Sequence, residues 1–327
     1  MLRTRLCELF GILHPVVLGG MGSATDANLA AAVSKAGGLG IVGCMGRSPA
    51  WIADTARAIR AGTDSPFGLN LLLFETEPAS VDAVLNAGPP VFSTAWAWPE
   101  QDLRELFSRA HGRGAKVLHM VSGVPEARRA AEAGADAICA QGTEGGGHVG
   151  LMGTLALVPQ AVAAVAPVPV IAAGGIATGE GLAAALALGA EGVLVGTRFL
   201  ATPEAPIADS LKQAVLASDG HDTVLTEIPD IARGRVWPGA YSRVVRNRLI
   251  ETWAGREGEL RARRAEVGPA MRRAFETGDA DGAPLFIGQD AGLIDSILSA
   301  GEVVRRLVRD AEEALRRCTR AVSPPAP

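Results

Sequence analysis

Gln141 to Gly150 is the stretch of this sequence whose residue types and spacing best suit chemistry. It reads Gln-Gly-Thr-Glu-Gly-Gly-Gly-His-Val-Gly, so three consecutive glycines precede His148. Such runs cost backbone entropy and are tolerated where the chain must adopt positive φ or admit a ligand closely. A lone histidine is more often structural, but an imidazole in this setting can act as a general base or hydrogen-bond donor near neutral pH. The pattern predicts a binding loop with His148 as the catalytic residue, and Glu144 either binds, orients the loop or faces solvent.

Short apolar runs alternate with helix-forming stretches on both sides of this loop. The runs are continuous rather than alternating, which is typical of strands covered on both faces of a parallel sheet. About eight such β-α units predict a closed (β/α)8 TIM barrel, and an open doubly wound sheet is the alternative. The predicted strands are 15–18, 39–42, 67–73, 91–93, 116–120, 137–140, 170–172 and 193–195. The predicted helices are 27–36, 51–61, 80–86, 99–110, 125–133, 157–165, 179–188 and 205–217.

Glycine-rich loops follow several of these strands, and in a barrel such loops gather at one face. Gly174-Gly175 and Gly196-Thr197 follow the seventh and eighth predicted strands. Backbone N–H groups at helix N-termini suit a phosphate, so this pair of loops predicts a phosphate site. Gly20-Met21-Gly22 and Asn70 follow the first and third strands and could face the edge of a ring system. Ordinary turn glycines and an N-capping Asn are the alternative interpretation of that second group.

The alternation of apolar runs and helix-forming stretches ends after Ser218, where arginines are frequent in a largely helical segment. We interpret residues 1–217 as the barrel, 218–287 as a small helical cap, and 288–327 as a segment that returns to the barrel. An amphipathic helix is predicted over 303–317 and a disordered Pro-rich tail over 323–327. The arginines either pair with nearby glutamates on a solvated surface, or line a cap over the barrel mouth that attracts an anionic substrate.

Composition limits the classes of function that remain. The chain has 327 residues, is 48% hydrophobic, and carries a net charge of −4, so we expect no nucleic-acid or membrane partner. Its four cysteines lie far apart in the sequence and predict free thiols, and the sequence shows no metal-ligand cluster. Prolines interrupt the apolar stretch 155–173, which argues against a membrane span. With no signal-peptide pattern, a cytoplasmic protein is expected, with a homodimer as the assembly considered.

Together these motifs resemble the nitronate monooxygenase family, formerly called 2-nitropropane dioxygenases, which are FMN-dependent barrels related to FMN-containing enoyl-ACP reductases. The resemblance covers nearly the whole chain. The matching stretches are 19–22, 34–40, 66–70, 141–148, 169–176, 196–199 and 288–293.

The resemblance implies FMN as the cofactor, its phosphate held by the loops after the last two strands and its ring placed near the first, third and sixth. It also implies that His148 occupies the family's catalytic position and that 218–287 covers the flavin. The implied cofactor-binding residues are Gly20, Met21, Gly22, Asn70, Gln141, Gly146, Gly147, Ala173, Gly174, Gly175, Gly196 and Thr197.

The implied reaction is oxidation of alkyl nitronates, or of nitroalkanes, by FMN and O2 to a carbonyl compound and nitrite. His148 would donate a hydrogen bond to the nitronate or remove the α-proton. One rival is an NAD(P)H-dependent enoyl thioester reductase, and another is a non-catalytic flavin-binding barrel. The chain departs from the family in two places. Some members have a lysine near the end of the fifth strand, where this chain has Met120, and Gly145 replaces a common alanine before Gly-Gly-His.

Overall fold

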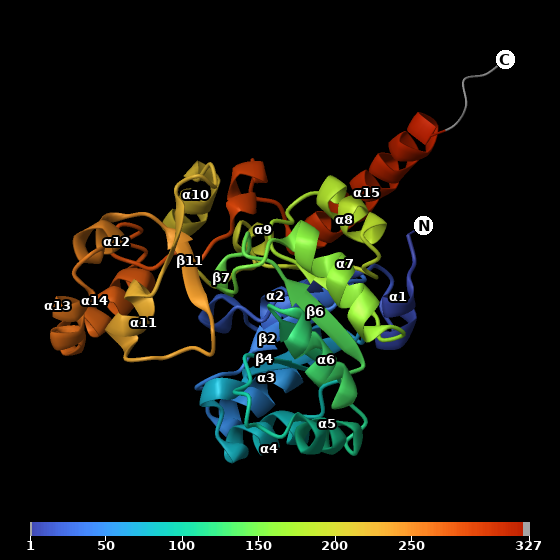
Figure 1. The fold of residues 1–327 in the computed structure, drawn as a ribbon, viewed down its shortest axis with the longest axis horizontal. Helices are drawn as coiled ribbons and strands as arrows, with labels where there is room; N and C mark the ends of the chain where they lie inside the picture. Colours follow the sequence, from blue (N-terminus) through green and yellow to red (C-terminus); the bar gives the residue numbers. More distant parts are fainter. Residues whose placement is uncertain (1, 323–327) are drawn as a thin grey trace.

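The computed structural model describes the backbone of residues 2–322 and the side chains as far as residue 319. The predicted disordered tail, 323–327, lies outside the described residues. The parallel strands form a barrel that lies at the right of Figure 1, and the cap lies at the left.

Eight parallel strands follow the order β1-β9-β8-β6-β5-β4-β3-β2. A parallel bridge between Val17 and Leu39 joins β1 to β2 and closes the ring. The predicted (β/α)8 barrel is therefore confirmed, and the open-sheet alternative is wrong. The barrel strands are β1 (Val16–Leu18), β2 (Gly40–Gly43), β3 (Phe67–Leu72), β4 (Val91–Ala95), β5 (Lys116–Val121), β6 (Ala137–Gln141), β8 (Val170–Ala173) and β9 (Val193–Val195).

Helices cover the outside of the barrel and begin where the sequence offers caps. Asp26, for example, accepts a hydrogen bond from the N–H of Leu29 and starts α2, as its position before a helix-forming run predicts. The helices are α1 (Arg5–Phe10), α2 (Ala27–Lys35), α3 (Pro49–Gly62), α4 (Pro78–Asn86), α5 (Leu103–His111), α6 (Val124–Glu132), α7 (Thr154–Val165), α8 (Gly179–Ala187), α9 (Thr197–Leu200) and α10 (Asp209–Ala217).

The barrel has two apolar layers. Side chains such as Ile41, Leu118 and Ile171 fill its interior, and a larger cluster that includes Leu29, Phe107 and Phe199 packs between strands and helices. All three described core cysteines, Cys7, Cys44 and Cys139, are buried free thiols, and Cys318 is an exposed one.

The cap contains two short strands besides its helices, and these strands were not predicted from the sequence. It contains α11 (Ile228–Arg233), α12 (Arg248–Trp253), α13 (Glu257–Ala262), α14 (Arg264–Thr277), β10 (Thr223–Thr226) and β11 (Tyr241–Val245). β11 joins β10 and β7 (Gly147–Val149) in an antiparallel sheet of order β10-β11-β7. The aromatic and β-branched residues of β11 favour a strand, but the surrounding arginines obscure that signal.

The remaining segment crosses back over the barrel. After a 3-10 turn (η3, Gln289–Leu293), α15 (Ala300–Val322) packs against α8 and α2. The last described helix therefore lies against helices that cover the barrel. The exact domain limits at 217 and 287 stay predictions.

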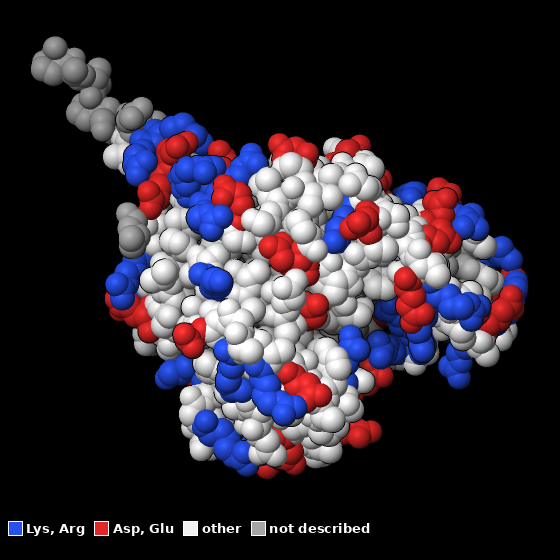
Figure 2. Space-filling view, turned by 180° about the vertical axis from the view of Figure 1, so that it is seen from behind, with Lys and Arg blue, Asp and Glu red and all other residues white. Residues whose placement is uncertain are grey.

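Several arginines on the cap surface are paired with acidic side chains. Arg256 contacts Glu259 at 2.8 Å and Arg263 contacts Glu266 at 2.8 Å. Figure 2 shows basic and acidic side chains interleaved over the cap, at the right of that view. This pairing supports the interpretation of a solvated charged surface for these arginines. No helix among residues 2–322 is both long and apolar enough to cross a membrane.

Gly40 marks the closest approach of a helix to the barrel. A Cβ at Gly40 would lie 2.0 Å from the carbonyl oxygen of Ala30 in α2. We expect Gly40→Ala to lower the free energy of unfolding by at least about 2 kcal/mol, because backbone on both sides must move. Gly258 is the matched control, since it lies in α13 with open space around its Cα, and Gly258→Ala should stabilise by about 0.5–1 kcal/mol. Denaturant unfolding of both variants tests the pair, and equal effects would contradict it.

Candidate active site

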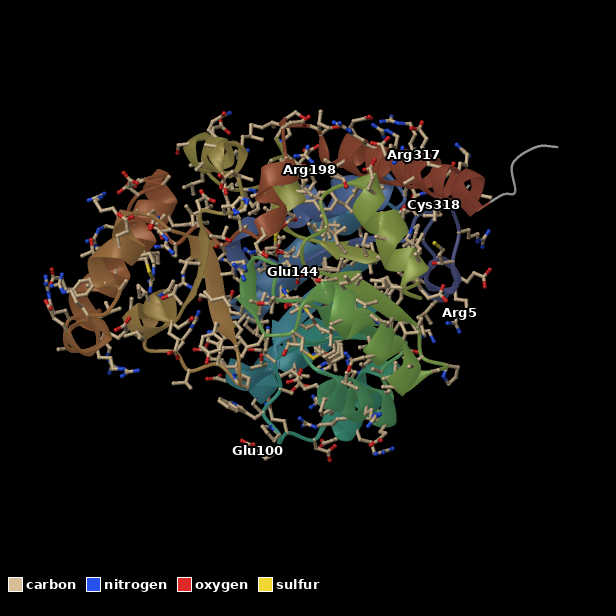
Figure 3. All side chains as sticks on the ribbon, turned by 45° about the horizontal axis from the view of Figure 1, so that its top comes forward. Arg5, Glu100, Glu144, Arg198, Arg317 and Cys318 are labelled. Carbon is tan, nitrogen blue, oxygen red and sulfur yellow. The ribbon has the colours of Figure 1, made fainter. Side chains whose placement is uncertain are left out.

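Hydrogen bonds to neighbouring segments hold the loop that carries His148. The N–H of Gly142 donates to Ala173 at 2.9 Å, and that of Gln289 donates to the carbonyl of Glu144 at 2.8 Å. The Glu144 carboxylate accepts from the backbone N–H and the hydroxyl of Thr154 at the start of α7. Figure 3 places Glu144 close to where barrel and cap meet. Glu144 therefore orients the loop, which was one of the three roles open to it.

Strand β7 carries His148 into the antiparallel sheet of the cap. It pairs with β11 so that His148 lies opposite Ser242, Val149 opposite Tyr241 and Gly147 opposite Arg243. Gly147 has φ +81°, which glycine adopts without strain, and it precedes the histidine directly. A Cβ at Gly146 would lie within 2.6 Å of the Ile287–Gly288 backbone. The glycine run thus lets the loop pass tightly against the returning chain and turn into a strand.

Three cap residues surround the imidazole of His148. Its Nε2 lies 2.9 Å from Oδ1 of Asp230 and 3.1 Å from Oγ of Ser242. The indole of Trp237 stacks on the ring, with centroids 3.4 Å apart and planes 11° from parallel. Among the described residues, no hydrogen bond reaches Nδ1. This atom also keeps some exposed surface, because it is not one of the fully buried atoms that lack a partner. Nδ1 is therefore the ring nitrogen open to a ligand.

The environment of His148 favours the neutral imidazole. Burial lowers its pKa below the ordinary value, the hydrogen bond and charge of Asp230 oppose that shift, and the charges of Arg233 and Arg235 add to it. The His148 side chain keeps only 10% of its surface exposed. A neutral histidine at pH 7 can accept a proton, which is the state a general base requires.

Aromatic rings enclose this imidazole. The ring centroid of Trp237 lies 4.3 Å from that of Phe74 and 6.0 Å from that of Trp96, which it meets edge to face. The ring centroids of Phe286 and His148 are 5.6 Å apart. Phe74 and Trp96 come from barrel loops, whereas Trp237 and Phe286 come from the segment after Ser218. The aromatic rings around His148 therefore come from both parts of the chain.

An ion pair ties the same two parts together. Arg235, two residues before Trp237, contacts Glu75 after β3 at 3.0 Å. The pair lies at the surface and contributes little by itself. Its location nevertheless fixes the end of the loop that carries Trp237.

The loops predicted to hold a phosphate lie side by side, because β8 and β9 are neighbours. Gly174 and Gly175 have φ of +94° and +75°, as a tight glycine turn requires. The Thr197 hydroxyl accepts from the N–H of Gly288 at 3.0 Å and bonds to Asp290, so it also secures the returning chain. Burial raises the pKa of Asp290 to about 6, with its backbone bond and Thr197 acting in the opposite direction.

The residues predicted to face a ring system also come together. Gly20 abuts Asn70, since a Cβ at Gly20 would lie 2.7 Å from the Asn70 Cβ. Met21 reaches over Gly196, with its sulfur 3.3 Å from where a Cβ would stand, and the space around Gly22 is open. Gln141, the last residue predicted near the ring, ends β6 with a buried, unpaired Oε1. Ala173, predicted to bind the cofactor, has its side chain in the barrel interior.

Sequence reasoning missed Asp230, Ser242 and Trp237. Each belongs to the cap and reaches His148 only through the pairing of β7 with β11. The aromatic and β-branched residues of Tyr241–Val245 are the available strand signal, but the frequent arginines around them favour a helical interpretation.

Known proteins of similar sequence and structure identify the family of this chain. A model of the family described as nitronate monooxygenase matches residues 3–81 and 74–310. The chain belongs to the nitronate monooxygenase family. It is thereby an oxidoreductase, and the predicted family resemblance is confirmed.

Relatives of this nitronate monooxygenase family member differ in their named reactions. A Mycobacterium tuberculosis protein named (3aS,4S,5R,7aS)-5-hydroxy-7a-methyl-1-oxo-octahydro-1H-indene-4-carboxyl-CoA dehydrogenase is 35% identical, with 95% of this chain and 96% of that protein covered. FabK from Thermotoga maritima has a TM-score of 0.88 and 34% identity, covering 98% of this chain and all (100%) of that one. Nitroalkane oxidase from Streptomyces ansochromogenes has a TM-score of 0.81 and 29% identity, covering 96% and 99%.

A second buried histidine, His119, provides a stability test. It lies in β5, where its Nδ1 is 2.8 Å from the Thr94 hydroxyl, and burial lowers its pKa to about 3. Between pH 6.5 and about 3 the unfolded chain holds a proton on His119 that the folded protein does not, so stability falls as the pH falls through this window. We expect His119→Asn to flatten that dependence.

The measurement is the free energy of unfolding in denaturant at pH 7, 5.5 and 4.5. His221→Asn, a change at an exposed histidine, is the matched control. Parallel pH profiles for wild type and His119→Asn would contradict a buried neutral histidine.

Proposed function

We propose that this protein is an FMN-dependent enzyme that oxidises alkyl nitronates, and nitroalkanes through their nitronates, with O2 to a carbonyl compound and nitrite. The observation that carries the proposal is the arrangement of His148. Its Nε2 is engaged by Asp230, whereas Nδ1 is open and the neutral ring is favoured. This arrangement suits removal of a proton from carbon.

A nitroalkane is a carbon acid, and its α-proton is the one His148 would take at Nδ1. The product of that step is the nitronate, an anion, and the imidazolium formed beside it carries the opposite charge. A preformed nitronate needs no such step and would instead receive a hydrogen bond from a protonated Nδ1. One group can therefore serve both substrates.

The residues at the barrel mouth fit the flavin that the family resemblance implies. The Oε1 of Gln141 is a buried acceptor without a donor, and buried polar atoms of this kind are rare in native proteins. The flavin pyrimidine edge has an N–H that would satisfy it, with Asn70 and Gly20 along the same edge. FMN, when bound there, would accept electrons from the substrate and pass them to O2.

The phosphate of FMN would lie at the Gly174-Gly175 and Gly196-Thr197 loops. Neighbouring strands place both loops together, and their glycines leave the backbone N–H groups unencumbered.

The enclosing aromatic rings favour a small substrate. Phe74 and Trp96 each pack against Trp237, which covers His148, so a long acyl chain would have to displace these rings. The second candidate is nevertheless an enoyl thioester, reduced with electrons from NAD(P)H. It is favoured by the 35% identical relative named as a carboxyl-CoA dehydrogenase, because the α-carbon of a thioester is also a carbon acid.

Anaerobic mixing of the purified protein with propionate 3-nitronate, and separately with NADH or NADPH, tests these alternatives through visible flavin absorbance. Bleaching by the nitronate alone supports the proposal. Bleaching by the nucleotide alone supports the thioester candidate. No response to either points to a non-catalytic flavin-binding barrel, and absence of flavin from the preparation would overturn all three.

His148→Ala should lower turnover of a neutral nitroalkane by about 10²–10⁴-fold, the usual contribution of a general base. Since the pKa of His148 is lowered, wild-type turnover should remain high to below pH 6.5 and fall only as the ring becomes protonated. Steady-state oxygen consumption across pH 5–8 measures both, with His221→Ala as the surface control. Full activity of His148→Ala would contradict the assignment.

Gln141→Met should weaken retention of FMN without destabilising the flavin-free protein. The change removes an unpaired buried acceptor and keeps the volume, so the free energy of unfolding of flavin-free protein should stay equal or rise. The flavin-to-protein ratio after gel filtration and the unfolding midpoint measure the two effects separately. Undiminished flavin retention would place the ring elsewhere.

A further inference from the structure

Asp230 is a charged group in the cap that the sequence did not single out. Asp230 is only 4% exposed. Its carboxylate accepts three hydrogen bonds: from His148 Nε2 at 2.9 Å, from Trp237 Nε1 at 2.9 Å and from Ser242 Oγ at 2.7 Å. A buried carboxylate must be paired or hydrogen-bonded to remain ionised. These three donors provide that compensation.

The donors allow only one arrangement of protons. The Trp237 indole can only donate, and the Ser242 hydroxyl gives its proton to Oδ2 of Asp230. The Ser242 oxygen therefore presents a lone pair to His148, 3.1 Å from Nε2, on the same side as Oδ1 of Asp230. Both partners of Nε2 are acceptors, so Nε2 must carry the proton.

We propose that Asp230 is a positioning residue that holds His148 in the Nε2–H tautomer and thereby makes Nδ1 the atom that receives the substrate proton. The inference deepens the proposed function, because it rests on His148 acting as a base. It also means that residues of the cap determine the tautomer, since Asp230, Ser242 and Trp237 all follow Ser218.

The proton step balances on these atoms. The substrate C–H bond breaks, its proton joins Nδ1, and its electron pair forms the C=N bond of the nitronate while the nitro oxygens take the negative charge. Asp230 stays ionised and stabilises the imidazolium through Nε2–H. Trp237, stacked on the ring, excludes water from one face and prevents the imidazole from rotating.

Asp230→Asn is the informative variant because it keeps the shape and removes the charge. The Asn Oδ1 still accepts from Trp237 and becomes a neutral, weaker acceptor for Nε2. The amide N–H groups donate toward Ser242, whose hydroxyl is then free to donate to Nε2. We expect the tautomer to change to Nδ1–H, which leaves no lone pair facing the substrate. Ser242→Ala is the matched comparison, since it keeps the carboxylate and should keep the Nε2–H tautomer.

The tautomer is read directly from long-range 1H–15N correlations of the full chain labelled with 15N-histidine at pH 7.5, with His148→Ala to identify the signals. We expect a protonated Nε2 and unprotonated Nδ1 in wild type and Ser242→Ala, and the reverse in Asp230→Asn. A wild-type Nδ1–H tautomer overturns the proposal without any need for a variant to fold. An unchanged tautomer in folded Asp230→Asn overturns it as well.

Kinetics give the second test. Turnover of a neutral nitroalkane by Asp230→Asn should fall about 10²–10⁴-fold, whereas turnover of the preformed nitronate, which needs no α-proton removal, should fall less than 10-fold. Equal losses on both substrates would indicate a general structural effect and overturn the positioning role. If His148→Ala retains nitroalkane turnover, the proposed function fails; if only Asp230→Asn retains it, this inference fails.

Discussion

The antiparallel pairing of β7 with β11 is the interaction on which the rest of the site depends. It joins three residues of a barrel loop to the cap and sets Ser242 opposite His148. Register is decisive here, because a slip of one residue would turn the imidazole to the other face of the small sheet. The glycine run before His148 lets the chain leave the barrel and enter this pairing within a few residues.

Burial of charge imposes the second constraint. Three donors converge on the buried carboxylate of Asp230, and two of them, from His148 and Trp237, come from rings that stack on each other. The polar and aromatic contacts are therefore not separable. Trp237 stacks on the histidine with its ring and supports the histidine's partner with its N–H.

The barrel and its loops could be predicted from sequence because their signals are local. Continuous apolar runs indicate parallel strands, and glycines such as Gly174 and Gly175 take the positive φ that tight loops at strand ends require. His148 was identified for the same reason, from the three glycines that precede it. The family resemblance, carried by the same stretches, placed the chain among the nitronate monooxygenases, and the family model agrees.

The partners of His148 could not be predicted, because they depend on pairing between segments about ninety residues apart along the chain. Asp230 reads as one more charged residue in a charged segment, and Ser242 has no distinctive neighbours. Arg256 and Arg263 drew attention by their number, yet they pair with local glutamates at the surface. The number of charged residues was therefore a poor guide to which of them matter.

The loop with Trp237 contacts the barrel, the imidazole and the carboxylate at once. Arg235 joins this loop to Glu75 on the barrel, and Trp237 both covers the imidazole and donates to Asp230. Displacing this one side chain would uncover a face of the ring and leave Asp230 with two donors. The covering of the imidazole and the hydrogen bonding of its partner are thereby coupled through a single residue.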